Sequence, residues 1–224
     1  MDFIEKIFLA SSKGHTFIIV ATNYFTKWVK TSAMKTITST AVKKFIETKI
    51  LHRYKVPETI VTDRMPSFIS KEVEEFASKF KIKMIQSSLY YPQSNGQAEA
   101  SNKILVNIIK RMVAGSPEKR HEKLGDTLWA YRTSKRARTG TTPYALTFGQ
   151  DVVLPMEINV SSIRIQNQFG LHSEEYIQVM CQGVEDLDVA RIKALNKIQE
   201  GKRVVARAYN KKVKLKTFKE RELV

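Results

Sequence analysis

The spacing of apolar and polar residues in the first part of the chain predicts three strands. Residues 16–22 form an almost unbroken apolar and β-branched run, typical of a central strand covered on both faces. Residues 1–9 and 28–33 have strand-like patterns on either side, and the turn Ser11-Ser12-Lys13-Gly14 separates the first two segments. Together these segments predict an antiparallel meander.

A helix and a further strand are expected next. Residues 38–54 repeat apolar side chains at helical spacing, with Thr38 or Ser39 as the expected N-cap. Pro57 follows this segment and ends the helix, because proline removes a backbone donor and clashes with the preceding turn. Residues 59–62 then form a short apolar strand.

The chain continues with a second helix, a strand and a loop that leads into a third helix. Ser70 is expected to cap the second helix, and residues 81–86 alternate between polar and apolar as a strand does. Residues 90–99 run from this strand through a loop, where Ser94 and Gln97 have the spacing of a capping box. The third helix therefore begins near this pair.

The remaining pattern predicts helices and a change of composition. Residues 115–117 read Gly-Ser-Pro and break the third helix, and a fourth helix is expected from about Pro117 to Arg132. From Leu154 the pattern changes: residues 158–170 are irregular, and residues 173–201 are helix-like with mixed polarity. We therefore predict a core domain over residues 1–157 and a linker, helix and basic tail over residues 158–224.

Charge points to a polyanionic partner. The formal net charge is +16 over 224 residues, and nucleic acid is the usual partner of so basic a chain. A highly charged, soluble surface without a specific partner is the alternative. Cys181 is the only cysteine, which excludes an internal disulfide and a cysteine-based zinc cluster within one chain. No signal peptide is visible, and the apolar run at residues 17–22 is far too short to span a membrane.

Three carboxylates are the candidate metal-binding and catalytic residues. Asp63 follows a predicted strand, and Glu99 lies in the first turn of a predicted helix, with 35 residues between the two. Asp2 lies near the start. Paired divalent ions at a phosphoryl-transfer site need several carboxylates from different elements. Taken singly, each residue has an ordinary structural role: Asp63 as a turn residue or cap, and Glu99 as a partner of the helix dipole.

Several segments carry a resemblance to a known family. The chain resembles the integrase catalytic cores of gypsy-type LTR retrotransposons, particularly those of plants. The resemblance rests on residues 17–28, 61–63, 91–103, 128–132, 142–144 and 154–157. It implies an α/β, ribonuclease H-like fold, a mixed five-stranded sheet flanked by helices, with a C-terminal helical, basic extension.

The resemblance also implies an activity and its residues. Asp2, Asp63 and Glu99 match the family's catalytic triad of carboxylates, which would hold Mg²⁺ or Mn²⁺. The implied reaction is the processing of DNA 3′ ends and their transfer into target DNA. The implied partners are the element's DNA ends, the target DNA and further copies of this chain, and the implied location is the nucleus.

Candidate nucleic-acid contacts come from three parts of the chain. One group lies in the loop before the Glu99 helix, a second on that helix, where Asn102 and Lys103 match family positions, and a third in the basic tail, which is expected to be mobile or weakly helical. The residues are Tyr90, Gln93, Asn95, Asn102, Lys103, Lys110, Lys202, Arg203, Arg207, Lys211, Lys212 and Lys214. The alternatives are a Glu99–Lys103 pair on a solvated helix face and a tail that is only a linker.

The chain departs from the family pattern at a few positions. Few residues precede Asp2, and Asn23 stands where relatives often carry aspartate; we expect Asp2 rather than Asn23 to be the ligand. Met65 replaces a usual glycine, so a positive φ there would strain it or shift the loop. The family's zinc domain and most of its C-terminal domain are expected to be absent. A catalytically inactive, nucleic-acid-binding or self-associating remnant and a general ribonuclease H-like nuclease therefore remain as alternatives.

Overall fold

A computed structural model gives the fold as two compact units, Met1–Ser134 and Lys135–Val224, which we describe separately. It describes residues 1–4, 11, 13–87, 96–112, 119, 121–149, 152 and 173–211. The division between units falls after Ser134, earlier than the predicted domain boundary at residue 157, which stays a prediction.

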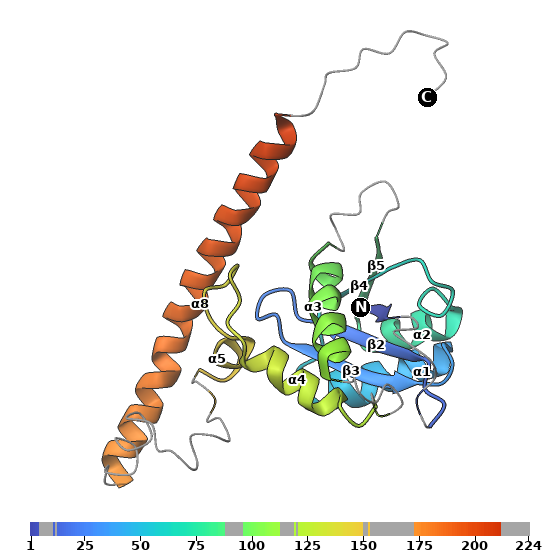
Figure 1. Ribbon diagram of the computed structural model, residues 1–224, viewed down its shortest axis with the longest axis horizontal. Helices are drawn as coiled ribbons and strands as arrows, with labels where there is room; N and C mark the ends of the chain where they lie inside the picture. Colours follow the sequence, from blue (N-terminus) through green and yellow to red (C-terminus); the bar gives the residue numbers. More distant parts are fainter. Residues whose placement is uncertain are drawn as a thin grey trace. The chain divides into compact units, whose positions relative to one another are not determined.

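The first unit contains the predicted meander. Strands β1 (Asp2–Ile4), β2 (Phe17–Thr22) and β3 (Val29–Met34) form an antiparallel sheet in that order (Figure 1). In its register Asp2 lies opposite Val20, and Val20 lies opposite Thr31. The order and direction of the three strands are therefore as predicted. Strand β1 ends at Ile4, and residues 5–9 of the predicted first strand lie outside the described residues.

A second, parallel pair of strands differs from the predicted five-stranded sheet. Strand β4 (Thr59–Thr62) pairs with β5 (Lys83–Gln86), and within the described residues these two form a sheet separate from the meander. The Met1 amino group donates a hydrogen bond to the Val61 carbonyl, which connects the start of β1 with β4. Within the described residues no ladder joins β1 to β4, and one continuous five-stranded sheet stays a prediction.

The predicted first helix has three parts. Thr38 is the N-cap, and its hydroxyl accepts the Ala41 N–H at 3.2 Å. Helix α1 (Ser39–Phe45) continues into a π-helical turn, η1 (Ile46–Ile50), and a 3-10 turn, η2 (Leu51–Arg53). Residues 38–54 are thus helical as predicted, but their hydrogen-bond pattern changes along the segment.

The second helix has the N-cap that the sequence predicts. Helix α2 (Lys71–Lys79) begins after Ser70, whose hydroxyl accepts the Val73 N–H at 3.4 Å. The helix is followed by Lys81 in a left-handed conformation (φ 55°), which turns the chain into β5. Both elements therefore lie where the sequence places them.

Two hydrophobic clusters cover opposite faces of the meander, because alternate side chains of a strand point to opposite faces. One cluster joins β1 and β2 to α1 and α2, and it includes Phe3, Ile19, Val42, Phe45, Val73 and Ala77. The other joins the sheet to helices α3 (Gly96–Met112) and α4 (Leu124–Thr133), and it includes Ile4, Ile18, Val20, Leu105, Ile109 and Tyr131. Burial of each large apolar side chain contributes about 1.5–3 kcal/mol. Asp2 pairs with Val20, so it lies in register with the second cluster, on the α3 side.

Helix α4 begins later than predicted. The sequence places its start near Pro117, but the helix begins at Leu124 after a turn over residues 121–123. The predicted break at residues 115–117 lies outside the described residues. Lys123 occupies the N-cap position without a side-chain cap, so packing of Leu124, Thr127 and Tyr131 sets this helix rather than a local start signal.

The second unit contains helices α5 (Pro143–Phe148) and α8 (Ser173–Asn210). Gly149 ends α5 with a φ of 82°, and a Cβ there would lie 3.2 Å from the Gly183 carbonyl oxygen of α8, so glycine also permits this close approach. Helix α8 continues to Asn210, well beyond the predicted end near Gly201. None of the described helices is long and apolar enough to cross a membrane.

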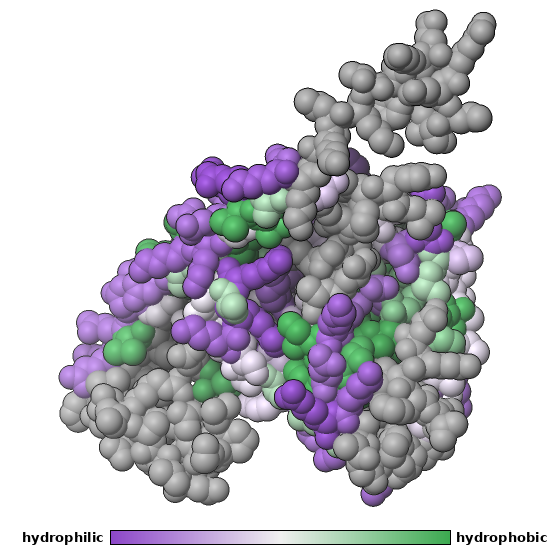
Figure 2. Space-filling view, turned by 45° about the horizontal axis from the view of Figure 1, so that its top comes forward, coloured by the Kyte–Doolittle hydropathy of each residue, from purple (hydrophilic) through white to green (hydrophobic). Residues whose placement is uncertain are grey.

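Hydrophilic and hydrophobic side chains are both exposed on the described surface. Figure 2 shows one face, on which hydrophilic side chains surround small hydrophobic areas. On α8 the exposed residues include Lys202, Arg203 and Arg207. Residues 202–210 of this basic segment form the last part of α8, because lysine, arginine and alanine favour a helix and cations favour its C-terminal end. The expected mobility of the basic tail stays a prediction.

Candidate functional site

Asp2 is the first residue of β1 and is only partly exposed. Its Oδ1 accepts the Phe3 N–H at 2.8 Å, and its Oδ2 accepts a hydrogen bond from Asn102 Nδ2 at 2.6 Å. Strand β1 fixes the backbone position of the carboxylate, and helix α3 fixes its orientation.

Asp63 lies close enough to Asp2 for the two charges to interact. It directly follows β4, and its Oδ1 accepts the Met65 N–H at 3.2 Å. Burial raises the pKa of Asp2 above its usual range, and the negative charge of Asp63 raises it further. Burial lowers the pKa of the Met1 amino group to about 6, although Asp2 and Asp63 both act to raise it. The structure therefore brings both carboxylates to the meeting point of β1 and β4.

Met65 stands where the resembling family usually has glycine, and it adopts an ordinary backbone conformation there. Within the described residues, only Lys27 and Lys81 among non-glycine residues have a positive φ, so Met65 needs no left-handed conformation. Its N–H bonds the Asp63 carboxylate, and its side chain packs against the α1–α2 cluster. The strain that a positive φ would cause is therefore absent at this loop.

Asn102 has a different environment from the one predicted. Helical spacing places it beside an exposed stripe of α3 as a DNA contact, but only 8% of its surface is exposed. Its Nδ2 bonds Asp2, whereas its buried Oδ1 has no hydrogen-bond partner. Asn102 shares the buried face of α3 with Leu105 and Ile109. It is thus positioned by its contact with Asp2, and the predicted contact with DNA stays a prediction.

Glu99 belongs to the same helix. It lies in α3 three residues before Asn102, and residues at this spacing are neighbours on a helix surface. Its backbone position is therefore one turn from the residue that holds Asp2. The Glu99 side chain lies outside the described residues.

The other predicted contacts are distributed over both units. Lys103 and Lys110 are exposed on α3, and Lys202, Arg203, Arg207 and Lys211 are exposed on or directly after α8. Tyr90, Gln93, Asn95, Lys212 and Lys214 lie outside the described residues. Ser94 of the predicted capping box also lies outside them.

The loop after β2 carries Asn23, the alternative to Asp2, and Tyr24, whose pKa Asp2 affects. Asn23 Oδ1 accepts the N–H groups of Phe25 and Thr26, at 3.0 and 2.9 Å, so this side chain caps a turn. Burial raises the pKa of Tyr24, and the charge of Asp2 raises it as well. Tyr24 is not among the predicted site residues; its position directly after β2, beside Asn23, is the signal that the sequence offers.

The chemistry of these donors fits a divalent cation. Asp2 and Asp63 gather two carboxylates whose mutual repulsion a cation would relieve, and the unpartnered Asn102 Oδ1 is a buried oxygen next to them. Among the described side chains, however, no group of three metal-ligating residues is assembled. A third carboxylate would have to come from a residue such as Glu99, at the start of α3.

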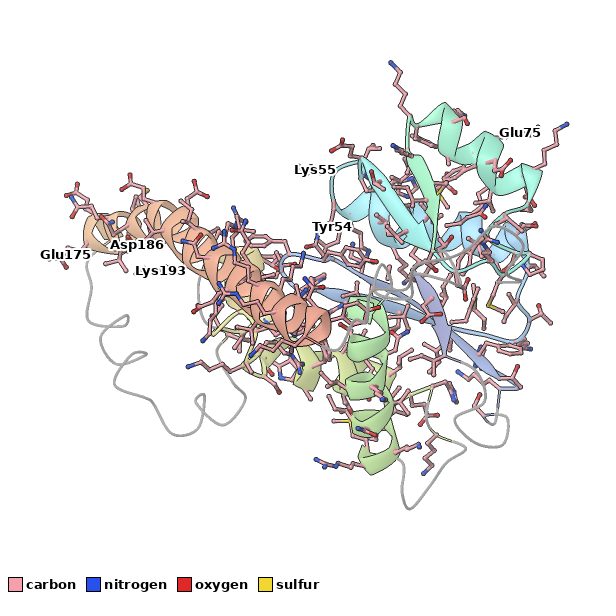
Figure 3. The ribbon with its side chains drawn as sticks, turned by 90° about the horizontal axis from the view of Figure 1, so that it is seen from above. Tyr54, Lys55, Glu75, Glu175, Asp186 and Lys193 are labelled. Carbon is pink, nitrogen blue, oxygen red and sulfur yellow. The ribbon has the colours of Figure 1, made fainter. Side chains whose placement is uncertain are left out.

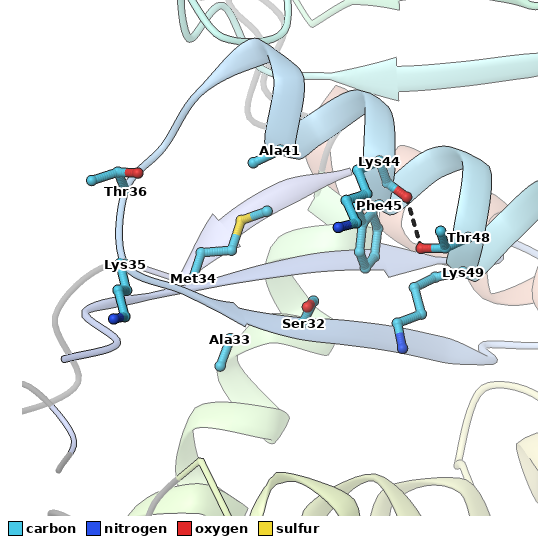
Figure 4. A pocket seen from close by; sticks show the side chains of 10 residues that line it. All are labelled: Ser32, Ala33, Met34, Lys35, Thr36, Ala41, Lys44, Phe45, Thr48 and Lys49. Carbon is cyan, nitrogen blue, oxygen red and sulfur yellow. Dashed lines mark hydrogen bonds between the residues drawn. The ribbon is translucent and has the colours of Figure 1, made fainter. Parts of the chain in front are cut away.

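A pocket on the opposite face of the sheet has a different character. It measures about 420 Å³ and lies between β3 and α1–η1 (Figure 4). Its lining includes Lys35, Lys44 and Lys49 and contains no carboxylate. Thr48 Oγ1 donates to the Lys44 carbonyl at 2.7 Å beside it. This pocket is therefore separate from the Asp2–Asp63 site.

Comparison with known proteins points to one family. The family described as "Integrase core domain" matches residues 1–92. The chain is 27% identical over 155 residues to the Pro-Pol polyprotein of feline foamy virus, which covers 69% of this chain and 13% of the polyprotein. It is 25% identical over 195 residues to the Transposon Tf2-3 polyprotein of Schizosaccharomyces pombe, covering 86% of this chain and 14% of the polyprotein. The chain therefore spans less than a sixth of these relatives.

Solved structures show the same fold. The catalytic core domain of BIV integrase has a TM-score of 0.52 at 22% identity, and the match covers 65% of this chain and 90% of that domain. A chain of the simian T-cell lymphotropic virus intasome has a TM-score of 0.53 at 22% identity, covering 58% of this chain and 47% of that one. The family model and the relatives show similarity to integrase core domains of the retroviral and retrotransposon kind, and the solved structures show a mixed α/β fold shared with integrase cores.

Proposed function

We propose that this chain contains the catalytic core of a gypsy-type retrotransposon integrase, which processes DNA 3′ ends and joins them to target DNA. The observation that carries the proposal is the pair Asp2 and Asp63, which β1 and β4 bring together within a fold shared with integrase cores. Their interaction joins positions far apart in the sequence and supports the expectation that both belong to one set of carboxylates.

Each residue of the site has a role in this proposal. Asp2 and Asp63 hold Mg²⁺ or Mn²⁺, and Glu99 completes the site from the first turn of α3. The bound ions supply positive charge beside the reacting phosphate and favour deprotonation of the attacking water or 3′-hydroxyl. Asn102 is a positioning residue, because its amide fixes the Asp2 carboxylate. Lys103 and Lys110 lie exposed on the same helix, where they contact the DNA backbone.

The remaining parts of the proposal concern partners and location. The basic residues of α8 bind DNA without sequence preference, since phosphate contacts carry no sequence information. Two DNA segments must be held at once during strand transfer, which favours a homo-oligomer. Action on DNA ends and target DNA implies that the chain works in the nucleus.

The decisive experiment is a strand-transfer assay on the purified chain with a short duplex of the element's end sequence. We expect a product with Mg²⁺ or Mn²⁺ and none with a chelator. Asp63→Asn and Glu99→Gln should each lower the rate at least about a hundredfold, because each keeps size but removes a charge that holds the ion.

The matched control is Glu75→Gln, which changes the same chemistry on exposed α2 (labelled in Figure 3) and should leave the rate unchanged. Equal rates for Asp63→Asn and the unaltered chain would refute the assigned site. DNA binding without any strand transfer would instead favour an inactive, nucleic-acid-binding remnant.

A further inference from the structure

We propose that Lys30, Arg53 and Arg132 form a second anion site, at the outer edge of strand β3, which binds a phosphodiester group of a nucleic-acid backbone. The site uses neither Asp2 nor Asp63. Only the choice of nucleic acid as the source of the phosphate rests on the proposed function.

Lys30 reaches this edge from one face of the sheet. Its Nζ donates to the Lys49 carbonyl of η1 at 2.6 Å and lies 3.0 Å from the centre of the Tyr54 ring. Tyr54 directly follows η2 and is labelled in Figure 3. An ammonium group has three donors, so two remain for a ligand after the bond to Lys49.

Arg132 reaches the same edge from the other face. Its Nε and Nη2 donate to the Val29 carbonyl at 3.2 and 2.8 Å, and its guanidinium carbon lies 4.1 Å from the centre of the Trp28 ring. Val29 directly precedes Lys30, and β3 is the outer strand of its sheet. The two cations therefore approach one strand edge from its two sides.

The cluster is positive without an acidic partner. Arg53 is the last residue of η2 and directly precedes Tyr54, the ring that Lys30 contacts. Burial lowers the pKa of Lys30, and together with the charges of Arg132 and Arg53 it brings this pKa to about 7. Burial also lowers the pKa of Arg132. Among the salt bridges of the described residues, none involves these three cations. An anion between them would relieve the repulsion that now disfavours the charged form of Lys30.

A nucleic-acid backbone suits this edge better than a single carboxylate would. The pocket beside it, with Lys35, Lys44 and Lys49, adds further positive charge and contains no carboxylate (Figure 4). Lys49 joins the two regions, because its carbonyl accepts from Lys30 while its side chain lines the pocket. Phosphates repeated along a backbone match such a series of cations. Tyr54, which is 41% exposed, adds an aromatic surface.

The test compares duplex DNA affinity across a salt series for the full chain carrying Asp63→Asn. On this background we add Lys30→Met, which removes the bond to the Lys49 carbonyl, or Arg53→Gln; both variants keep the bonds of Arg132 to the Val29 carbonyl. We expect each to weaken binding about tenfold, as the removal of a charged hydrogen bond would. We also expect the salt slope to fall by about 0.9 for each phosphate that the variant no longer neutralises.

Lys79→Met is the matched control, because Lys79 lies on α2 near the Phe80 ring, at 5.9 Å, outside the cluster. Duplex binding should also weaken as pH rises above about 7 in the unaltered site, since free Lys30 then loses its proton; Lys30→Met should remove this dependence. Among the described residues, Arg53 and Arg132 are the charged groups that shift the pKa of Lys30, and Tyr54 is the titratable group whose ring it contacts.

Three outcomes would overturn the proposal. The first is an unchanged affinity and salt slope in both variants, and the second is an equal loss of affinity in Lys79→Met. The third is a result in which Lys30→Met and Arg53→Gln weaken the binding of inorganic phosphate but leave the binding of duplex DNA unchanged. Because binding is measured without cleavage, failure here leaves the carboxylate site untouched, and failure of the strand-transfer assay leaves this binding result intact.

Discussion

Asn102 Nδ2 donates a hydrogen bond of 2.6 Å to Asp2 Oδ2, and this bond joins helix α3 to the first residue of strand β1. The two residues are 100 positions apart in the sequence. The bond positions the candidate ligand Asp2 through the same helix that carries Glu99 one turn earlier. Helix α3 therefore links two of the three predicted carboxylates.

Removing this bond should affect both stability and activity. Asn102→Ala leaves Asp2 without its side-chain donor, so we expect the free energy of unfolding to fall by about 1–3 kcal/mol. Strand transfer should fall while duplex binding is retained, because the carboxylate loses its orientation. Urea unfolding and the strand-transfer assay measure the two effects. Asn107→Ala, at an exposed position of the same helix, is the control and should change neither.

Divalent ions should stabilise the folded chain. A ligand that binds only the native state adds about 1.4 kcal/mol at a tenfold excess over its dissociation constant. We therefore expect Mg²⁺ or Mn²⁺ to raise the melting temperature, and a chelator to reverse the rise. Asp63→Asn should lose this response, whereas Glu75→Gln should keep it. A response that is equal in both variants would place the ion elsewhere.

Lys30 should make stability depend on pH. Its pKa is about 7 in the folded protein, against 10.5 for the ordinary group. Between these values the unfolded chain binds more protons, so stability should rise as pH rises from about 7 towards 10.5. Lys30→Met should flatten this rise and should be more stable than the unaltered chain at a pH of about 6. Denaturant unfolding at a series of pH values measures the slope, and an unchanged slope would contradict the assignment.

Arg132 should stabilise the edge of the sheet. Arg132→Ala removes both donors from the Val29 carbonyl and the contact with Trp28, so we expect a loss of about 1–3 kcal/mol. Arg111→Ala, at an exposed position near the end of α3, should change stability little. Thermal and denaturant unfolding of the two variants make the comparison. Equal effects would show that the edge contact contributes no stability.

The basic end of α8 should contribute to the salt dependence of DNA binding. Replacing Lys202, Arg203 and Arg207 together by glutamine keeps good helix formers but removes three charges. We expect the salt slope to fall by about 0.9 for each phosphate that these residues neutralise, with helix content unchanged by circular dichroism. An unchanged slope would place the DNA contacts elsewhere, for example at Lys103 and Lys110.

The sequence alone determined the local elements, because their signals lie within a few residues. Thr38 and Ser70 cap their helices as predicted. Each hydroxyl accepts the N–H three positions later, so this bond involves only neighbouring residues of the sequence. The run at residues 16–22 likewise became the central strand. The resemblance carried by the motif segments indicated the type of fold that the solved structures share.

Only the tertiary structure decided which residues meet. Asn102 lies on the buried face of α3 because Asp2 and the sheet pack there, which helical spacing alone did not show. Packing likewise sets the start of α4 at Leu124. The low pKa of Lys30 depends on burial and on Arg132, a residue from a distant part of the sequence. These features arise from contacts between distant segments, whose energies no local pattern encodes.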